Sequence, residues 1–69
     1  MNEKVKYIFK KPYVTDHGTL FENSEIRFFR GSVYYDGGLV PGVYAKELAD
    51  IVNTPALREE YLKVIPIVN

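Results

Sequence analysis

The spacing of apolar residues changes at Pro41-Gly42, and this change limits the possible folds more than any other feature of the chain. Before it, apolar residues alternate or form short patches between turn residues, as in β-strands. After it, four apolar residues recur at i, i+4, i+7 and i+8, which is typical of one helix face: Tyr44, Leu48, Ile51 and Val52. The sequence therefore predicts a β-rich first part followed by a helical segment.

The N-terminal segment KVKYIFKKPYV begins with a strand-like alternation. Val5, Tyr7 and Phe9 alternate with residues 4, 6 and 8, so that one set would face a core. Pro12 cannot donate a ladder hydrogen bond, and lysines and prolines are common on exposed sheet edges. We therefore predict a first strand at the edge of a sheet, ending near Pro12.

Four groups of turn residues separate the next apolar patches. Gly18 in TDHG can supply a positive φ angle, and Asn23-Ser24 indicates a bend between two short strands. Gly31 is expected at a bulge or a sharp corner. The segment 36–38, Asp-Gly-Gly, lies between β-forming residues and predicts a hairpin.

The C-terminal part predicts two helices and a closing strand. Asn53 is expected to end the first helix, whose outer face would carry Lys46, Glu47 and Asp50. Thr54-Pro55 is typical of an N-cap followed by proline at the first helical position. The helix PALREEYLK would bury Leu57 and Tyr61. Pro66 disfavours helical geometry at the preceding residue, so a strand is expected over 64–68.

These elements predict one domain, 1–69, of the α+β class, in which a small antiparallel sheet packs with a C-terminal helical segment. A sheet curled towards an SH3-like or OB-like barrel is the alternative. A chain of this size buries only about 60% of its unfolded surface. It has no cysteine to add disulfides. We therefore expect self-association, with a homodimer as the simplest form.

Charge and hydropathy limit the classes of partner. The net charge is zero, although residues 1–13 hold four lysines and one glutamate, whereas the remainder holds five basic and eight acidic residues. Strong non-specific nucleic-acid binding usually requires a domain-wide positive excess. No apolar run approaches the roughly 20 residues of a membrane span, and the N-terminus lacks a signal-peptide pattern. A cytoplasmic protein is expected.

The stretch RFFRGSVYYDGG, residues 27–38, is the strongest candidate for a functional surface. Alternation would direct Phe28, Val33 and Tyr35 inwards. It would place on the opposite face a set of aromatic and basic side chains: Arg27, Phe29, Arg30 and Tyr34. These rings are core if the helices cover that face, and otherwise a protein-contact surface. A third alternative is a weak nucleic-acid surface, with stacking on the rings and phosphate contacts from Lys4, Lys6, Arg27 and Arg30.

Residues suited to catalysis or metal binding are sparse. His17 beside Asp16 could form an oriented general base, but no serine or cysteine nucleophile has a recognisable spacing from it. Asp16, His17, Glu22 and Glu25 could approach one another, but their spacing matches no metal motif. Gly37 and Gly38 fit a hairpin better than a phosphate loop. We therefore expect no enzymatic activity, no cofactor and no metal.

Three segments give the whole chain a resemblance to a known class of proteins: KYIFKKPYV, FFRGSVYYDGG and YAKELADIVNTP. The chain resembles the short accessory proteins encoded by phages and prophages of Gram-positive bacteria. That resemblance implies a small binding or regulatory protein that acts on a larger machine. It assigns no functional residues.

Overall fold

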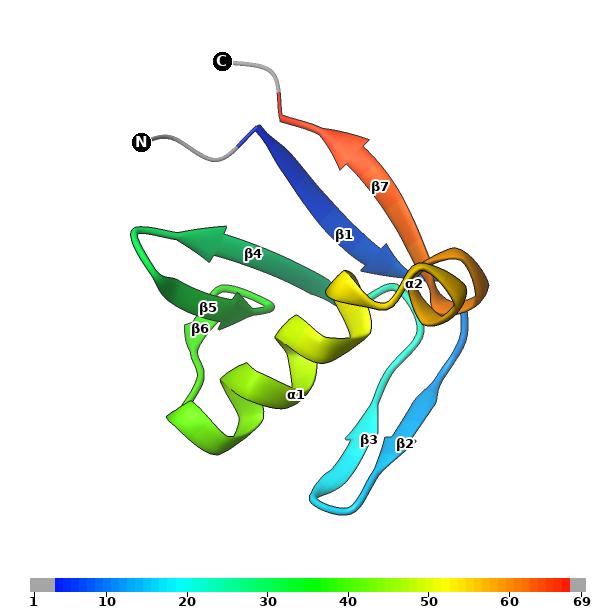
Figure 1. Ribbon diagram of the computed structural model, residues 1–69, viewed down its shortest axis with the longest axis horizontal. Coiled ribbons are helices and arrows are strands. Elements are labelled where there is room, and N and C mark those ends of the chain that lie inside the picture. Colours follow the sequence, from blue (N-terminus) through cyan, green and yellow to red (C-terminus); the bar gives the residue numbers. More distant parts are fainter. Residues whose placement is uncertain (1–3, 68–69) are drawn as a thin grey trace.

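The computed structural model describes residues 4–67 and has an α+β fold (Figure 1). Six strands precede two helices, and a seventh strand closes the described chain. In order, the elements are β1 (Val5–Phe9), β2 (Tyr13–Thr15), β3 (Gly18–Leu20), β4 (Glu25–Phe29), β5 (Ser32–Tyr35), β6 (Gly38–Leu39), α1 (Gly42–Asn53), α2 (Pro55–Tyr61) and β7 (Leu62–Pro66). The predicted fold class and the change from strands to helices near Pro41-Gly42 are confirmed.

The main sheet has five antiparallel strands in the order β6-β5-β4-β1-β7, and β2 and β3 form a separate hairpin. The predicted edge position of β1 is wrong, because β1 lies between β4 and β7. The chain returns after α2, and β7 pairs along the whole of β1, from Val5 opposite Pro66 to Phe9 opposite Leu62. β6 and β7 are the two edges and do not pair. The sheet is therefore open and is not a closed barrel.

Tight turns connect the hairpins at the places that the sequence indicates. Arg30 and Gly31 join β4 to β5 with φ angles of 51° and 79°, and Asp36 and Gly37 join β5 to β6 with 50° and 86°. Positive φ at both central residues is the geometry of a type I′ turn, which matches the twist of the flanking strands. Gly31 therefore forms a sharp corner, and the predicted hairpin at Asp36-Gly37 is confirmed.

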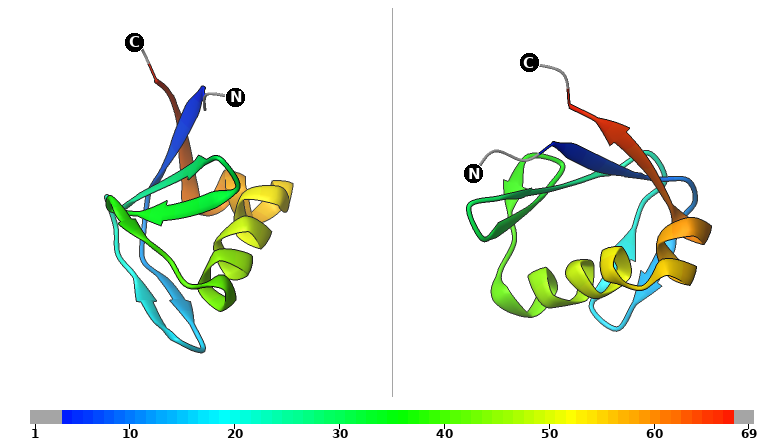
Figure 2. Two further views of the ribbon diagram at one scale, coloured as in Figure 1. Left: turned by 90° about the vertical axis from the view of Figure 1, so that its left-hand side faces the viewer. Right: turned by 45° about the horizontal axis from the view of Figure 1, so that its top comes forward.

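Both helices lie on one side of the main sheet (Figure 2). Between the sheet and α1 is a continuous hydrophobic core, whose buried members are Phe9, Ile26, Val33, Leu48, Ile51, Val52 and Leu62. The helical stripe predicted from the sequence supplies Leu48, Ile51 and Val52, whereas Tyr44 is 38% exposed. One layer of helices on one face of the sheet leaves the other face without a helical cover.

The second helix differs from its prediction in two details. No residue of α2 is fully buried, so Leu57 and Tyr61 only partly contact the core. Thr54 occupies the N-cap position, but its hydroxyl donates a hydrogen bond to the Asp50 carbonyl of α1 and does not cap α2. The closing strand β7 begins at Leu62, earlier than predicted, because that residue is buried against the core. Val68 lies outside the described residues.

Candidate functional site: the open face of the sheet

The face of the main sheet that is turned away from the helices is called the open face below. Residues directly opposite each other in antiparallel strands point to the same side, so the pairing register defines its members. Ile26, Phe28 and their partners face the core, and the alternate positions face outwards. The open face consists of Lys6, Ile8, Glu25, Arg27, Phe29, Ser32, Tyr34, Leu39, Lys63 and Ile65.

The residues singled out in the aromatic stretch lie on this face or at its border. Arg27 and Tyr34 are directly opposed across β4 and β5, and Phe29 at the end of β4 is 38% exposed. Arg30 lies in the following turn, with its guanidinium 5.3 Å from the centroid of the Phe29 ring. The helices cover the opposite face, so Phe29 and Tyr34 are not part of the core. Phe28, Val33 and Tyr35 point towards the core side, as predicted.

The open face is more basic than the chain as a whole. It carries Lys6, Arg27 and Lys63 against Glu25, a balance of three positive charges to one negative. Lys6 Nζ lies 3.1 Å from a carboxylate oxygen of Glu25, and both side chains are partly buried. Most acidic residues lie on the helices or on the β2–β3 side of the molecule: Asp16, Glu22, Glu47, Asp50, Glu59 and Glu60. That side also carries Lys10, Lys11, Lys46 and Arg58, so it has an excess of two negative charges, whereas the open face has an excess of two positive charges.

Apolar side chains from several strands complete the open face, and sequence analysis did not single them out. Ile8 and Ile65 are half-buried, and Leu39 of the short edge strand β6 is 65% exposed. The alternation within β1 already indicates that Ile8 points away from Phe9. The positions of Leu39 and Ile65 could not be inferred in this way, because they depend on which strands become neighbours.

The residues considered for catalysis or metal binding are not brought together. Asp16 and His17 form the β2–β3 turn and are exposed, whereas Glu25 is in β4 and forms the ion pair with Lys6. Within residues 4–67, no three histidine, cysteine, aspartate or glutamate side chains are grouped closely enough to hold a metal ion. His17 instead contacts Tyr44 of α1, with ring centroids 5.0 Å apart.

Neither helix in the described part of the chain is long and apolar enough to cross a membrane.

Comparisons with known proteins assign this chain to no family. No protein-family model, curated protein or solved structure matches the chain.

Proposed function

We propose that this protein is a non-enzymatic interaction module that binds another protein through the open face of its sheet. The observation that carries the proposal is the one-sided cover of the sheet: both helices pack on one face, and the other presents aromatic, aliphatic and basic side chains together. Tyrosine, phenylalanine and arginine are enriched in protein interfaces, and tyrosine and arginine are common among the few residues that dominate the binding energy.

The charge of the open face favours a partner with an acidic surface. A second copy bound face to face would bring together two surfaces that each carry an excess of positive charge, and like charges across an interface oppose binding. An acidic partner avoids this repulsion and gains from long-range attraction. A small accessory protein acting on a larger assembly, as the resemblance to phage proteins implies, would bind a heterologous partner in this way.

The proposal is tested with an open-face variant and a matched control. The open-face variant is Arg27→Ala/Phe29→Ala, and the control is Lys46→Ala/Asp50→Ala, which removes two exposed side chains from α1. Proteins from the native host that bind each tagged chain are identified by mass spectrometry. Binding of each candidate partner is then measured by calorimetry with purified components.

A true partner should bind the wild type and the control with equal affinity. It should bind the open-face variant at least about tenfold more weakly, as expected for loss of a hot-spot residue. Thermal unfolding of each variant establishes that the fold is retained. A partner that binds all three chains with the same affinity would place the interaction elsewhere and contradict the proposal.

A second candidate function is weak binding of single-stranded nucleic acid by the same face. Favouring it are the opposed pair Arg27 and Tyr34 and the stacking of Arg30 on Phe29, since exposed rings next to arginines stack on bases. Lys4 and Lys6 would supply phosphate contacts, although Lys6 would first have to leave Glu25. Titration of labelled oligonucleotides at two salt concentrations decides between the functions, because phosphate contacts make the affinity fall with salt.

A further inference from the structure

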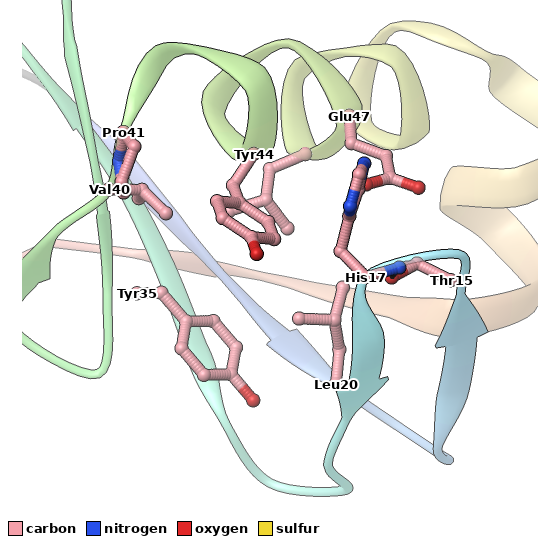
Figure 3. Close-up of a pocket in the computed structure, with 9 residues that line it drawn as sticks. Thr15, His17, Leu20, Tyr35, Val40, Pro41, Tyr44 and Glu47 are labelled. Carbon is pink, nitrogen blue, oxygen red and sulfur yellow. Dashed lines mark hydrogen bonds between the residues drawn. The ribbon is translucent and has the colours of Figure 1, made fainter.

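A cavity lies on the other side of the molecule from the open face, between the β2–β3 hairpin, the end of β5 and the first half of α1 (Figure 3). Its volume is about 320 Å³, at the lower end of the range for small-molecule sites. Nothing in the proposed function uses this cavity. Its lining combines an apolar floor, which includes Leu20 and Leu48, with three rings and one carboxylate.

The three rings come from three separate elements. His17 is in the β2–β3 turn, Tyr35 ends β5, and Tyr44 lies in the first turn of α1. Figure 3 shows Tyr35, Tyr44 and Leu20 pointing towards one another, with His17 beside Tyr44. The rings of His17 and Tyr44 meet edge to face at an interplanar angle of 75°. Aromatic faces of this kind attract cations through their quadrupole.

Two hydroxyl groups of the lining already have hydrogen-bond partners. The Tyr35 hydroxyl accepts a hydrogen bond from the Phe21 amide at 3.0 Å. The Thr15 hydroxyl donates to the Gly18 carbonyl at 2.8 Å and accepts from the His17 amide at 3.0 Å. These groups stabilise the hairpin against the sheet, so they fix the shape of the cavity and do not need a ligand.

Glu47 supplies the carboxylate of the lining. Sequence periodicity predicts it on the outer face of α1, but its side chain is half-buried and lines the cavity, three residues after Tyr44. Within the described chain, its carboxylate forms neither a hydrogen bond nor an ion pair. No lysine or arginine is among the described residues that line the cavity. A half-buried carboxylate without a countercharge favours a ligand that supplies one.

We propose that this cavity binds a small organic cation with an apolar body, such as a quaternary or primary alkylammonium group. The apolar body would pack on Leu20 and Leu48, the rings of Tyr35 and Tyr44 would contact the cationic end, and Glu47 would supply the negative charge. An anionic ligand would be repelled by Glu47, and a neutral one would leave that carboxylate unpaired. This inference does not depend on the proposed role of the open face.

The test compares choline with its neutral isostere 3,3-dimethylbutan-1-ol by titration followed in amide nitrogen–proton NMR spectra. We expect the shifts to map to the β2–β3 turn and α1, and choline to bind about fivefold more tightly, as for a partly exposed cation–π contact. Glu47→Gln and Tyr44→Leu should each abolish this preference. Glu59→Gln, on the exposed side of α2, is the matched control and should retain it.

Three results would overturn the proposal. Equal binding of choline and the alcohol would show an apolar site with no preference for a cation. Shifts that map to the open face would place the ligand outside the cavity. An absence of shifts with both probes in a folded protein, as judged by the dispersion of its spectrum, would show that the cavity does not bind this class of ligand.

Discussion

Arg27 and Tyr34 lie directly opposite each other on the open face, whereas their chain neighbours Phe28 and Val33 form the next opposed pair on the core side. The two pairs belong to the same two strands and differ only in the direction of their side chains. A shift of one residue in the pairing would exchange them, placing the arginine against the core. The burial of Val33 and Ile26 therefore fixes the residues that the open face presents.

The first prediction follows from this alternation. Val33→Ala should lower the free energy of unfolding by about 1–3 kcal/mol, because it leaves a void in a packed core. Arg27→Ala should cost less than Val33→Ala, because the Arg27 side chain is only partly buried and its removal leaves no void in the core. Urea denaturation of both variants measures the difference. Equal losses would mean that the two side chains contribute equally to stability, and would contradict the assignment of Val33 to the core and Arg27 to the open face.

The second prediction concerns two glycines that both have room for an added Cβ but differ in their backbone φ angle. An added Cβ would meet nothing within 4 Å at either Gly37 or Gly42, but only Gly37 has a positive φ, of 86°. Gly37→Ala should therefore destabilise the protein by about 1–2 kcal/mol through backbone strain alone. Gly42→Ala, at the start of α1, should stabilise it by about 0.4–1 kcal/mol by restricting the unfolded chain. Thermal unfolding of the two variants measures the difference: if the turn geometry is correct, Tm falls for Gly37→Ala and rises for Gly42→Ala.

The third prediction tests the link between the β2–β3 side of the molecule and the main sheet. The Tyr35 hydroxyl accepts the hydrogen bond from the Phe21 amide, so Tyr35→Phe should cost about 0.5–1.5 kcal/mol. Tyr34→Phe removes the hydroxyl of a neighbouring tyrosine whose side chain points to the open face, and it should be close to neutral. Chemical denaturation compares the two. A similar loss in both would show that the Phe21 contact does not contribute to stability.

The elements of this fold follow from local sequence patterns, but the arrangement of strands does not. Alternation, turn residues and the helical stripe are properties of neighbouring residues, and they predict the hairpin at Asp36-Gly37 and helix α1. The position of β1 depends on β7, which follows it by more than fifty residues. The same lysines that suggest an edge strand also fit the solvent face of a central strand, and only the pairing distinguishes these cases.

The candidate sites show the same division. The outward direction of Arg27, Phe29 and Tyr34 is a local consequence of alternation and could be predicted. The absence of a helical cover over these residues, and the presence of Ile65 and Lys63 beside them, depends on tertiary packing. The position of Glu47 in the cavity lining could not be predicted, because helix periodicity alone places it outwards, and the cavity is formed by packing of the β2–β3 hairpin near α1.

The fourth prediction concerns the exposed ion pair between Lys11 Nζ and a carboxylate oxygen of Glu60, which are 2.8 Å apart. The hydrogen bond from Lys11, aided by its charge, lowers the pKa of Glu60, and the same hydrogen bond raises the pKa of Lys11. A lowered acid pKa stabilises the fold above the pKa of the unfolded state, and this contribution is lost as pH falls through the folded value. The raised lysine pKa contributes below its unfolded value and is lost at alkaline pH.

Lys11→Met should therefore raise the pKa of Glu60 towards its ordinary value, as measured by NMR titration of the side-chain carboxyl. The effect should shrink in high salt, because both groups are exposed. Lys46→Met, which removes a lysine from α1, is the control and should leave this pKa unchanged. A Glu60 pKa that is the same with and without Lys11 would show that the pair does not persist in solution.

The fifth prediction concerns the exposed edge of β7. The Ile67 amide donates to the Lys4 carbonyl and the Lys10 amide to the Tyr61 carbonyl. Hydrogen-bonded pairs alternate along an antiparallel ladder, so the nitrogen of Pro66 points away from β1, towards the edge. Pro66 has no proton to donate, and the Leu62 amide is already bonded to the Arg58 carbonyl. This edge therefore offers a second strand few donors, which limits edge-to-edge pairing.

Pro66→Val should restore an outward-pointing donor and promote association of two β7 strands, which sedimentation velocity detects as a dimer that grows with concentration. Lys63→Val adds similar apolar surface to the same strand, but its amide points towards β1, so it leaves the donors of the edge unchanged. Dimerisation of the Pro66 variant alone would identify the missing donor as the barrier. Equal association of both variants would instead show that added apolar surface causes the dimerisation. No change in the association of either variant would show that another feature protects this edge.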